Sequence, residues 1–127
     1  MIGKLTTIVL IVKDMDRSVA FYRDVIGLKL EMHTPYWSSL SAGNILLGLH
    51  PESEKVKAQP GMGCSFGFEV EDIHSAVQEL KSGGARVQVE PKHEDFGWLA
   101  IVADPDGYPV QLAQTEPWAK ASNSGAQ

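Results

Sequence analysis

Apolar and polar residues follow one pattern that occurs twice along the chain. The segments 10–30 (LIVKDMDRSVAFYRDVIGLKL) and 67–87 (GFEVEDIHSAVQELKSGGARV) each run from an apolar strand to an acidic residue, an amphipathic helix, a glycine and a short strand. Internal similarity of this kind indicates a duplicated structural unit. The pattern therefore predicts two equivalent modules.

A helix is predicted in each copy, directly after an aspartate. Asp14 and Asp72 are typical N-caps, and glycines at 27 and 83–84 end the two apolar periodic stretches. The apolar stripes consist of Met15, Val19, Tyr22 and Ile26 in the first copy and Ile73, Val77 and Leu80 in the second. The two helices are expected to be equivalent.

Three further strands are predicted after each helix, which makes each module βαβββ and the fold α+β. Their ranges are 27–34, 36–43 and 44–50 in the first module, and 85–91, 97–104 and 108–114 in the second. Module 1 covers about 4–50 and module 2 about 64–114. The charged segment 51–63, rich in Pro and Gly, is typical of a surface linker, and 115–127 is expected to be a flexible tail.

Each predicted strand has one face for the helix and one free face, because side chains alternate along a strand. The residues expected to pack on a helix are Ile8, Leu10, Val12, Phe66, Phe68, Val70, Val110 and Leu112. The residues expected on the free face are Thr7, Val9, Ile11, Ser65, Gly67, Glu69, Pro109, Gln111 and Ala113. Small and polar side chains on a curved sheet suit a ligand cavity better than a dry core.

Composition limits the partners. The 127 residues carry a net charge of −5 without a basic block, which disfavours nucleic acid and anionic membranes and suits a neutral or cationic small molecule. The chain has one cysteine, Cys64, which is expected to be a small buried residue. The apolar opening, 5–12, is too short to span a membrane and lacks a cleavage site, which predicts a cytoplasmic protein.

Three segments, in this order, resemble the vicinal oxygen chelate superfamily, which includes glyoxalase I, extradiol dioxygenases, fosfomycin-resistance enzymes and bleomycin-resistance proteins. They are VKDMDRSVAFYRDVIGL (12–28), FEVEDIHSAV (68–77) and DPDGYPVQL (104–112), and the resemblance covers roughly 4–114. It implies a curved eight-stranded mixed sheet, a homodimer, and in the enzymes a divalent metal that acts as a Lewis acid on the substrate. The DPDG portion taken alone predicts only a tight turn.

The resemblance places weak donors at the metal-ligand positions of this family. The two usual histidines fall on Thr7 and Ser65, the usual glutamate falls on Gln111, and a further position falls near Leu47 or Gly48. Hydroxyl groups and one amide oxygen are poor ligands for Zn²⁺ or Fe²⁺. No metal cofactor is therefore expected at these positions.

The four histidines offer a substitute site. His33 and His50 fall on predicted strands, His74 on the exposed side of a helix, and His93 in a predicted loop that could overhang the cavity. A relocated metal would have His50 and Glu69 as its core.

The sequence supports two hypotheses of function, and a third ranks behind them. The first is a metal-free binder of a planar or cationic molecule, as in antibiotic or metabolite sequestration, with aromatic side chains stacking on the guest. Its ligand-binding residues would be Thr7, Tyr36, Trp37, His50, Ser65, Glu69, Phe96, Trp98 and Gln111. The same aromatics could instead plug the ends of the sheet or form dimer contacts.

The second hypothesis is a glyoxalase-like lyase or isomerase, or a dioxygenase, with a relocated metal or none. Its acid–base group would be His50, Glu69 or His93. In the third, the cavity is vestigial and the fold serves association.

Overall fold

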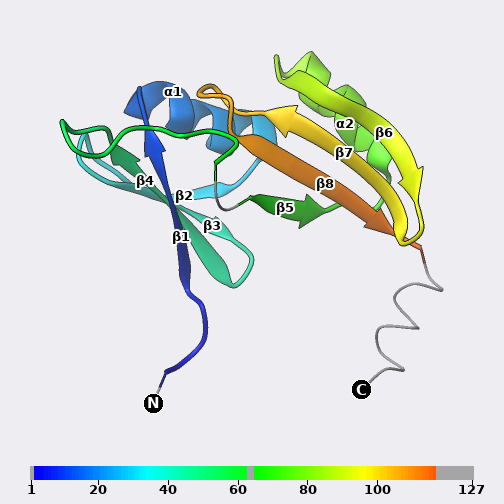
Figure 1. Cartoon of the computed structure of the whole chain (residues 1–127), viewed down its shortest axis with the longest axis horizontal. Helices are drawn as coiled ribbons and strands as arrows, with labels where there is room; N and C mark the ends of the chain where they lie inside the picture. Colours follow the sequence, from blue (N-terminus) through cyan, green and yellow to red (C-terminus); the bar gives the residue numbers. More distant parts are fainter. Residues whose placement is uncertain (1, 63–64, 117–127) are drawn as a thin grey trace. The chain divides into compact units, whose positions relative to one another are not determined.

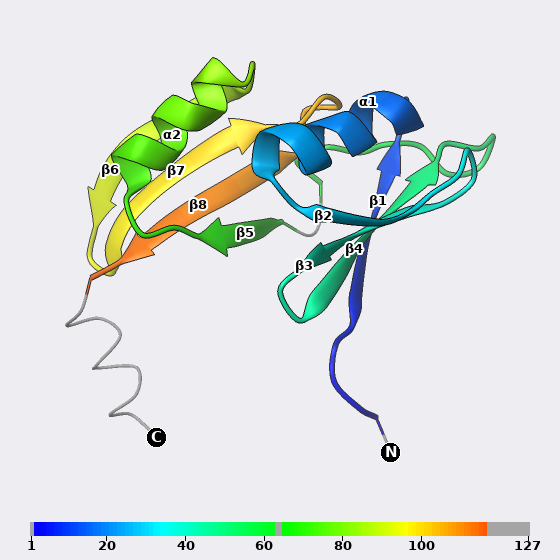
Figure 2. The same cartoon turned by 180° about the vertical axis from the view of Figure 1, so that it is seen from behind.

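Eight strands form two four-stranded mixed sheets in the computed structural model, which describes residues 2–62 and 65–116 (Figures 1 and 2). The chain divides into two compact units, Met1–Pro60 and Gly61–Gln127. The predicted α+β class and the repeated βαβββ order are confirmed, with four strands in each sheet.

The first unit follows the predicted order of elements. These are β1 (Thr7–Val12), α1 (Met15–Ala20), η1 (Phe21–Ile26), β2 (Lys29–His33), β3 (Ser38–Ala42) and β4 (Ile45–Pro51). The sheet order is β1-β4-β3-β2, with β1 parallel to β4 and the other neighbours antiparallel.

The second unit repeats this topology. Its elements are β5 (Phe66–Glu69), α2 (Ile73–Ser82), β6 (Arg86–Glu94), β7 (Gly97–Ala103) and β8 (Pro109–Thr115). The order is β5-β8-β7-β6, again with one parallel pair, β5 and β8. Strand β6 is longer than predicted and includes His93, and β8 includes Thr115 of the expected tail.

The first predicted helix changes type midway. Asp14 caps α1 by accepting a hydrogen bond from the backbone of Arg17 at 3.0 Å, as predicted. From Phe21 the chain continues as a π-helix, and the carbonyl of Tyr22 accepts hydrogen bonds from Gly27 and Leu28 at 3.1 and 2.9 Å. Gly27 ends the helix with φ 95°, which is readily accessible to glycine.

Helix α2 has the predicted cap and the predicted buried stripe. Asp72 accepts hydrogen bonds from the backbone of His74 and Ser75 at 3.1 and 3.3 Å, and these bonds, above all that from Ser75, lower the pKa of Asp72. Ile73, Val77 and Leu80 are buried. Helix α2 contacts β6, β7 and β8 and covers one face of their sheet (Figure 1).

The alternation of faces predicted for the strands is observed. On β1, Leu10 and Val12 are 8% and 0% exposed, whereas Val9 is 48% exposed. On β8, Val110 and Leu112 are buried and Gln111 is half-buried. Each sheet therefore has a helix side and a free face.

The first free face consists of Thr7, Val9, Ile11, Ser39, Ser41, Leu46, Gly48 and His50, which are paired across β1, β4 and β3. The second free face consists of Gly67, Glu69, Leu99, Ile101, Pro109, Gln111 and Ala113 on β5, β7 and β8, with Ser65 just before β5.

The DPDG segment forms the predicted turn before β8. The backbone of Gly107 donates to the carbonyl of Asp104 at 2.9 Å, and Gly107 has φ 95°. The Asp104 carboxylate accepts hydrogen bonds from the backbone of Asp106 and Tyr108, both at 2.9 Å. This segment therefore has a structural role.

Within the described residues, no helix has the length and apolar character needed to cross a bilayer. Cys64 and Trp118 lie outside the described residues.

Candidate functional site

The second free face brings together two of the positions that the family resemblance assigns to metal ligands. Gln111 lies on β8 opposite Gly67, and its Nε2 donates a long hydrogen bond of 3.4 Å to the Oγ of Ser65. A Cβ atom at Gly67 would stand 2.8 Å from the Cβ of Gln111. The absence of a side chain at Gly67 thus lets β5 lie close against Gln111.

The first free face carries an indole ring at the equivalent position. Gly48 on β4 lies opposite Val9 on β1, as Gln111 lies opposite Gly67 in the second unit. The ring of Trp37 lies over Gly48: a Cβ there would overlap Cη2 of the indole and stand 2.8 Å from Cζ2. Gly48 is buried although it lies on the free face, because Trp37 covers it.

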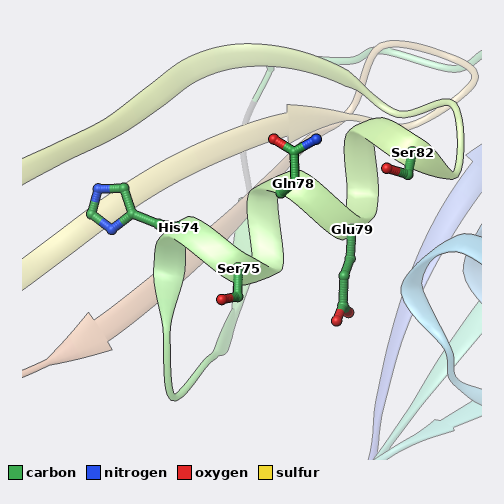
Figure 3. A pocket seen from close by; sticks show the side chains of 5 residues that line it. All are labelled: His74, Ser75, Gln78, Glu79 and Ser82. Atoms are coloured by element: carbon green, nitrogen blue, oxygen red, sulfur yellow. The ribbon is translucent and has the colours of Figure 1, made fainter.

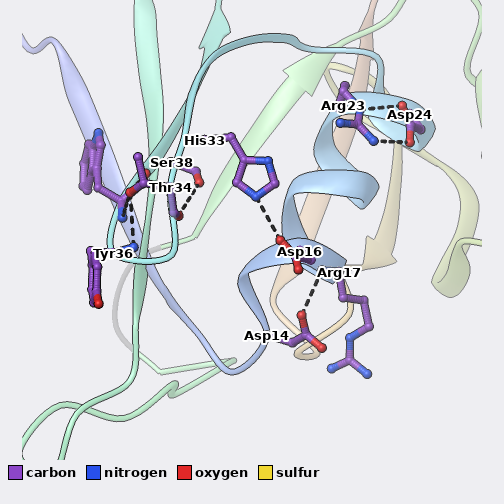
Figure 4. A network of polar contacts seen from close by, with 10 residues as sticks. Asp14, Asp16, Arg17, Arg23, Asp24, His33, Thr34, Tyr36 and Ser38 are labelled. Atoms are coloured by element: carbon purple, nitrogen blue, oxygen red, sulfur yellow. Dashed lines mark hydrogen bonds and ion pairs between the residues drawn. The ribbon is translucent and has the colours of Figure 1, made fainter.

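Hydrogen bonds in the turn before β3 fix the backbone of Trp37. The hydroxyl of Thr34 donates to the carbonyl of Trp37 at 2.8 Å and accepts from its backbone N–H at 2.9 Å. The backbone N–H of Thr34 donates to the same carbonyl at 3.0 Å. Figure 4 shows Thr34 and Tyr36 in this turn, and the separate contact of 3.0 Å between His33 and Asp16.

His50 is exposed on the first free face, opposite Ile11. Its Nδ1 lies 2.8 Å from the carbonyl oxygen of Pro51. A carbonyl can only accept a hydrogen bond, so Nδ1 carries the proton. In the neutral ring, Nε2 is therefore an acceptor.

The donor groups do not fit the divalent metal that the family resemblance implies. Thr7 contributes a hydroxyl, Gly48 contributes no side chain, and Ser65 and Gln111 contribute a hydroxyl and an amide that are hydrogen-bonded to each other. Zn²⁺ and Fe²⁺ prefer imidazole, thiolate or carboxylate ligands. The part of the chain that the structure describes also contains no group of three or more His, Cys, Asp and Glu side chains arranged to share an ion.

The second tryptophan lies on the helix side of its sheet. Trp98 shares this side with Ala100 and Val102, both 0% exposed. Its ring packs edge-on against His74 of α2 and His93 of β6, with ring centroids 4.9 and 5.0 Å apart. Trp37 directly precedes β3 and Trp98 is the second residue of β7, yet the two tryptophans lie on opposite sides of their sheets.

His93 is in a strand and not in the predicted loop. It pairs with Trp98, and its Nε2 lies 2.8 Å from Oε1 of Glu116. The difference arises because β6 extends to Glu94, beyond the predicted end of the strand at Pro91. This contact places His93 at the end of the β6–β7 hairpin.

The other predicted site residues lie at the ends of strands. Glu69 is the last residue of β5 and is exposed. Tyr36 is 77% exposed in the turn before β3, and Phe96 is half-buried in the turn before β7.

A shallow hollow also follows the outside of α2. Its lining consists of His74, Ser75, Gln78, Glu79 and Ser82 (Figure 3). All five are exposed polar residues of one helix, so the hollow lacks the convergent walls of a ligand pocket.

Comparisons with known proteins agree with this fold. A family model for the Glyoxalase/Bleomycin resistance protein/Dioxygenase superfamily matches residues 4–112, and the chain belongs to this superfamily. A probable lactoylglutathione lyase of Synechocystis sp. is 32% identical over 118 residues, which is 82% of this chain and 89% of the relative.

Solved structures with this fold have different described roles. TnmS3, an antibiotic binding protein from Streptomyces sp. CB03234, has a TM-score of 0.78 at 22% identity, covering 91% of this chain and 98% of TnmS3. A lactoylglutathione lyase from Agrobacterium tumefaciens has a TM-score of 0.69 at 19% identity, covering 88% of this chain and 93% of that one. At these identities the likeness establishes the fold alone.

Proposed function

We propose that this protein binds a small planar or cationic molecule without a metal, as a sequestering protein for an antibiotic or a metabolite does. The proposal takes the free faces of the sheets as the binding surface. The main support for this proposal is the contact of the Trp37 indole with Gly48. Gly48 is the position in the first module that is equivalent to Gln111 in the second, so the first module has an aromatic ring there in place of an amide. The antibiotic-binding role described for TnmS3 is consistent with it.

The weak donors at the family's metal positions support the same proposal. The side chains of Ser65 and Gln111 are joined by one long hydrogen bond, and the hydroxyl of Thr7 lies 3.3 Å from that of Thr6. A binder needs polar groups that orient a guest, and hydroxyl and amide groups serve this purpose well. The proposal also includes a cytoplasmic homodimer, which sedimentation equilibrium would test for oligomeric state.

A lyase or dioxygenase is the second candidate function. The 32% identity to the probable lactoylglutathione lyase of Synechocystis favours it. His50, Glu69 or His93 would supply the acid–base group. An assay for lactoylglutathione formation, with and without added metal, tests this alternative.

Metal titration separates the two candidates. We expect no tight stoichiometric uptake when the purified protein is titrated with Zn²⁺, Ni²⁺ or Fe²⁺, because the family positions lack imidazole and carboxylate donors. Calorimetry on the protein after treatment with a chelator measures this directly. Stoichiometric uptake that is lost in His50→Ala or Glu69→Ala would favour the enzyme and contradict the binder.

Tryptophan fluorescence locates the binding surface. In a screen of planar antibiotics, we expect a ligand to quench the wild-type protein and Trp98→Phe, but to quench Trp37→Phe much less. The reason is that Trp37 lies on a free face, whereas Trp98 packs between His74 and His93 on the helix side. Quenching that disappears in Trp98→Phe and persists in Trp37→Phe would contradict this assignment.

A further inference from the structure

We infer that the first free face binds an uncharged planar aromatic molecule with a hydroxyl or N–H donor on its rim. The ring would stack on Trp37, and the donor would hydrogen-bond to Nε2 of His50. This inference rests on the proposed function and narrows its ligand from planar or cationic molecules to one chemical class.

The tautomer of His50 defines the polar half of this site. Nδ1 is 2.8 Å from the carbonyl of Pro51 and must donate to it. This bond orients the imidazole ring and leaves the lone pair of Nε2 as the acceptor in the neutral side chain. His50 is exposed, so a ligand can reach this atom.

The spacing along β4 places the acceptor beside the aromatic platform. Gly48 and His50 lie on the same face two residues apart, a separation of roughly 7 Å along a strand. Trp37 lies on Gly48, so a fused two-ring molecule that covers the indole would bring a rim substituent toward His50. Stacking alone fixes the plane of a guest, and the hydrogen bond would fix its rotation within that plane.

The side chains around these two residues favour an uncharged ring. On β1, Val9 and Ile11 lie opposite Gly48 and His50, and Val9 is 48% exposed. Leu46 continues the face on β4 and is 37% exposed. The segments Thr7–Val12 and Ile45–Pro51 contain no Asp, Glu, Lys or Arg, so no carboxylate on these two strands would pair with a cation.

Two matched probes test the hydrogen bond. 2-Naphthol carries a hydroxyl donor, and 2-methoxynaphthalene has the same rings without the donor. We expect the wild-type protein to bind 2-naphthol about threefold to tenfold more tightly, as one net hydrogen bond provides. Calorimetric titration of the full chain, in neutral buffer, measures both dissociation constants.

Variants assign the preference to its residue. His50→Phe keeps a ring but removes the acceptor, and it should bind the two probes equally. His50→Gln retains an acceptor oxygen and should restore part of the preference. His74→Phe, a histidine substitution on the exposed side of α2, is the control and should behave as the wild type.

The outcomes distinguish this inference from the proposed function. Equal binding of the two probes by the wild-type protein, or a naphthol preference that survives in His50→Phe, would overturn the inference alone. Binding of neither probe, nor of any planar antibiotic in the screen, would overturn both. Far-ultraviolet circular dichroism of each variant checks that a loss of binding does not come from unfolding.

Discussion

Replacing Gly48 by alanine is expected to weaken the binding of planar aromatic molecules about tenfold or more, as the loss of one buried aromatic stack implies. A Cβ at position 48 would overlap Cη2 of Trp37 and stand 2.8 and 3.0 Å from Cζ2 and Cζ3. The backbone of Trp37 is held by Thr34, so the indole must rotate away from the sheet. The first free face would then lose its platform.

Two measurements test this expectation without requiring a known physiological ligand. The emission maximum of Gly48→Ala should shift to longer wavelength as Trp37 enters solvent, and its affinity for 2-naphthol should fall. Gly3→Ala is the matched control, because a Cβ at Gly3 meets no atom within 4 Å. Unchanged emission and unchanged affinity in Gly48→Ala would show that Trp37 does not carry the binding surface.

Replacing Gly97 by alanine is expected to destabilise the second unit by about 3 kcal/mol, the upper range for one strained residue. Gly97 has φ 141°, which side chains rarely allow. A Cβ there would also overlap the backbone oxygen of Gln114 and stand 2.9 Å from the backbone nitrogen of Glu116. Both atoms belong to the backbone of the segment that runs beside β7, so they cannot rotate away from the added Cβ as the end of a side chain can.

Urea unfolding followed by circular dichroism measures this effect. Gly43→Ala provides the control, because Gly43 also has a positive φ, 66°, but a Cβ there meets nothing within 4 Å. That control should cost about 1 kcal/mol from backbone strain alone. Equal midpoints for the two variants would show that the close approach at Gly97 does not constrain the fold.

The two modules use equivalent positions for different chemistry. In the second, Gln111 and Ser65 form a polar pair; in the first, Gly48 carries the indole of Trp37. A duplicated fold can diverge in this way because the helix side maintains the core while the free face tolerates new side chains. Neither position carries a carboxylate: Gln111 has a neutral amide side chain, and Gly48 has no side chain.

Much of the fold was predictable from local patterns. Asp14 and Asp72 cap their helices through short-range bonds, and the period-two alternation on β1 and β8 correctly separates buried Leu10 and Val110 from the free face. The repeat also indicated the βαβββ order of elements in both units. These features depend on neighbours in the sequence or on a period, which the residues themselves express.

Side-chain positions at the ends of strands were not predictable in the same way. Trp37 and Trp98 occupy similar places in the pattern, yet one lies over Gly48 and the other between two histidines on the helix side. Gly48 interrupts the apolar run ILLGLH, and a glycine inside a strand often indicates that another group packs closely against the backbone. The sequence does not show which residue that group belongs to. Strand β6 likewise continues past Pro91 because its partner β7 supplies the pairing.

The amino-acid sequence by itself thus determined the class of fold, the helix caps, which residues face each side of a strand, and the weak donor groups at positions 7, 65 and 111. Tertiary structure decided which residues meet: Trp37 with Gly48, Gln111 with Ser65, and Nδ1 of His50 with its neighbouring carbonyl. The physical reason is that periodicity determines the side of a strand, whereas packing across strands and rotamer choice determine the contact on that side.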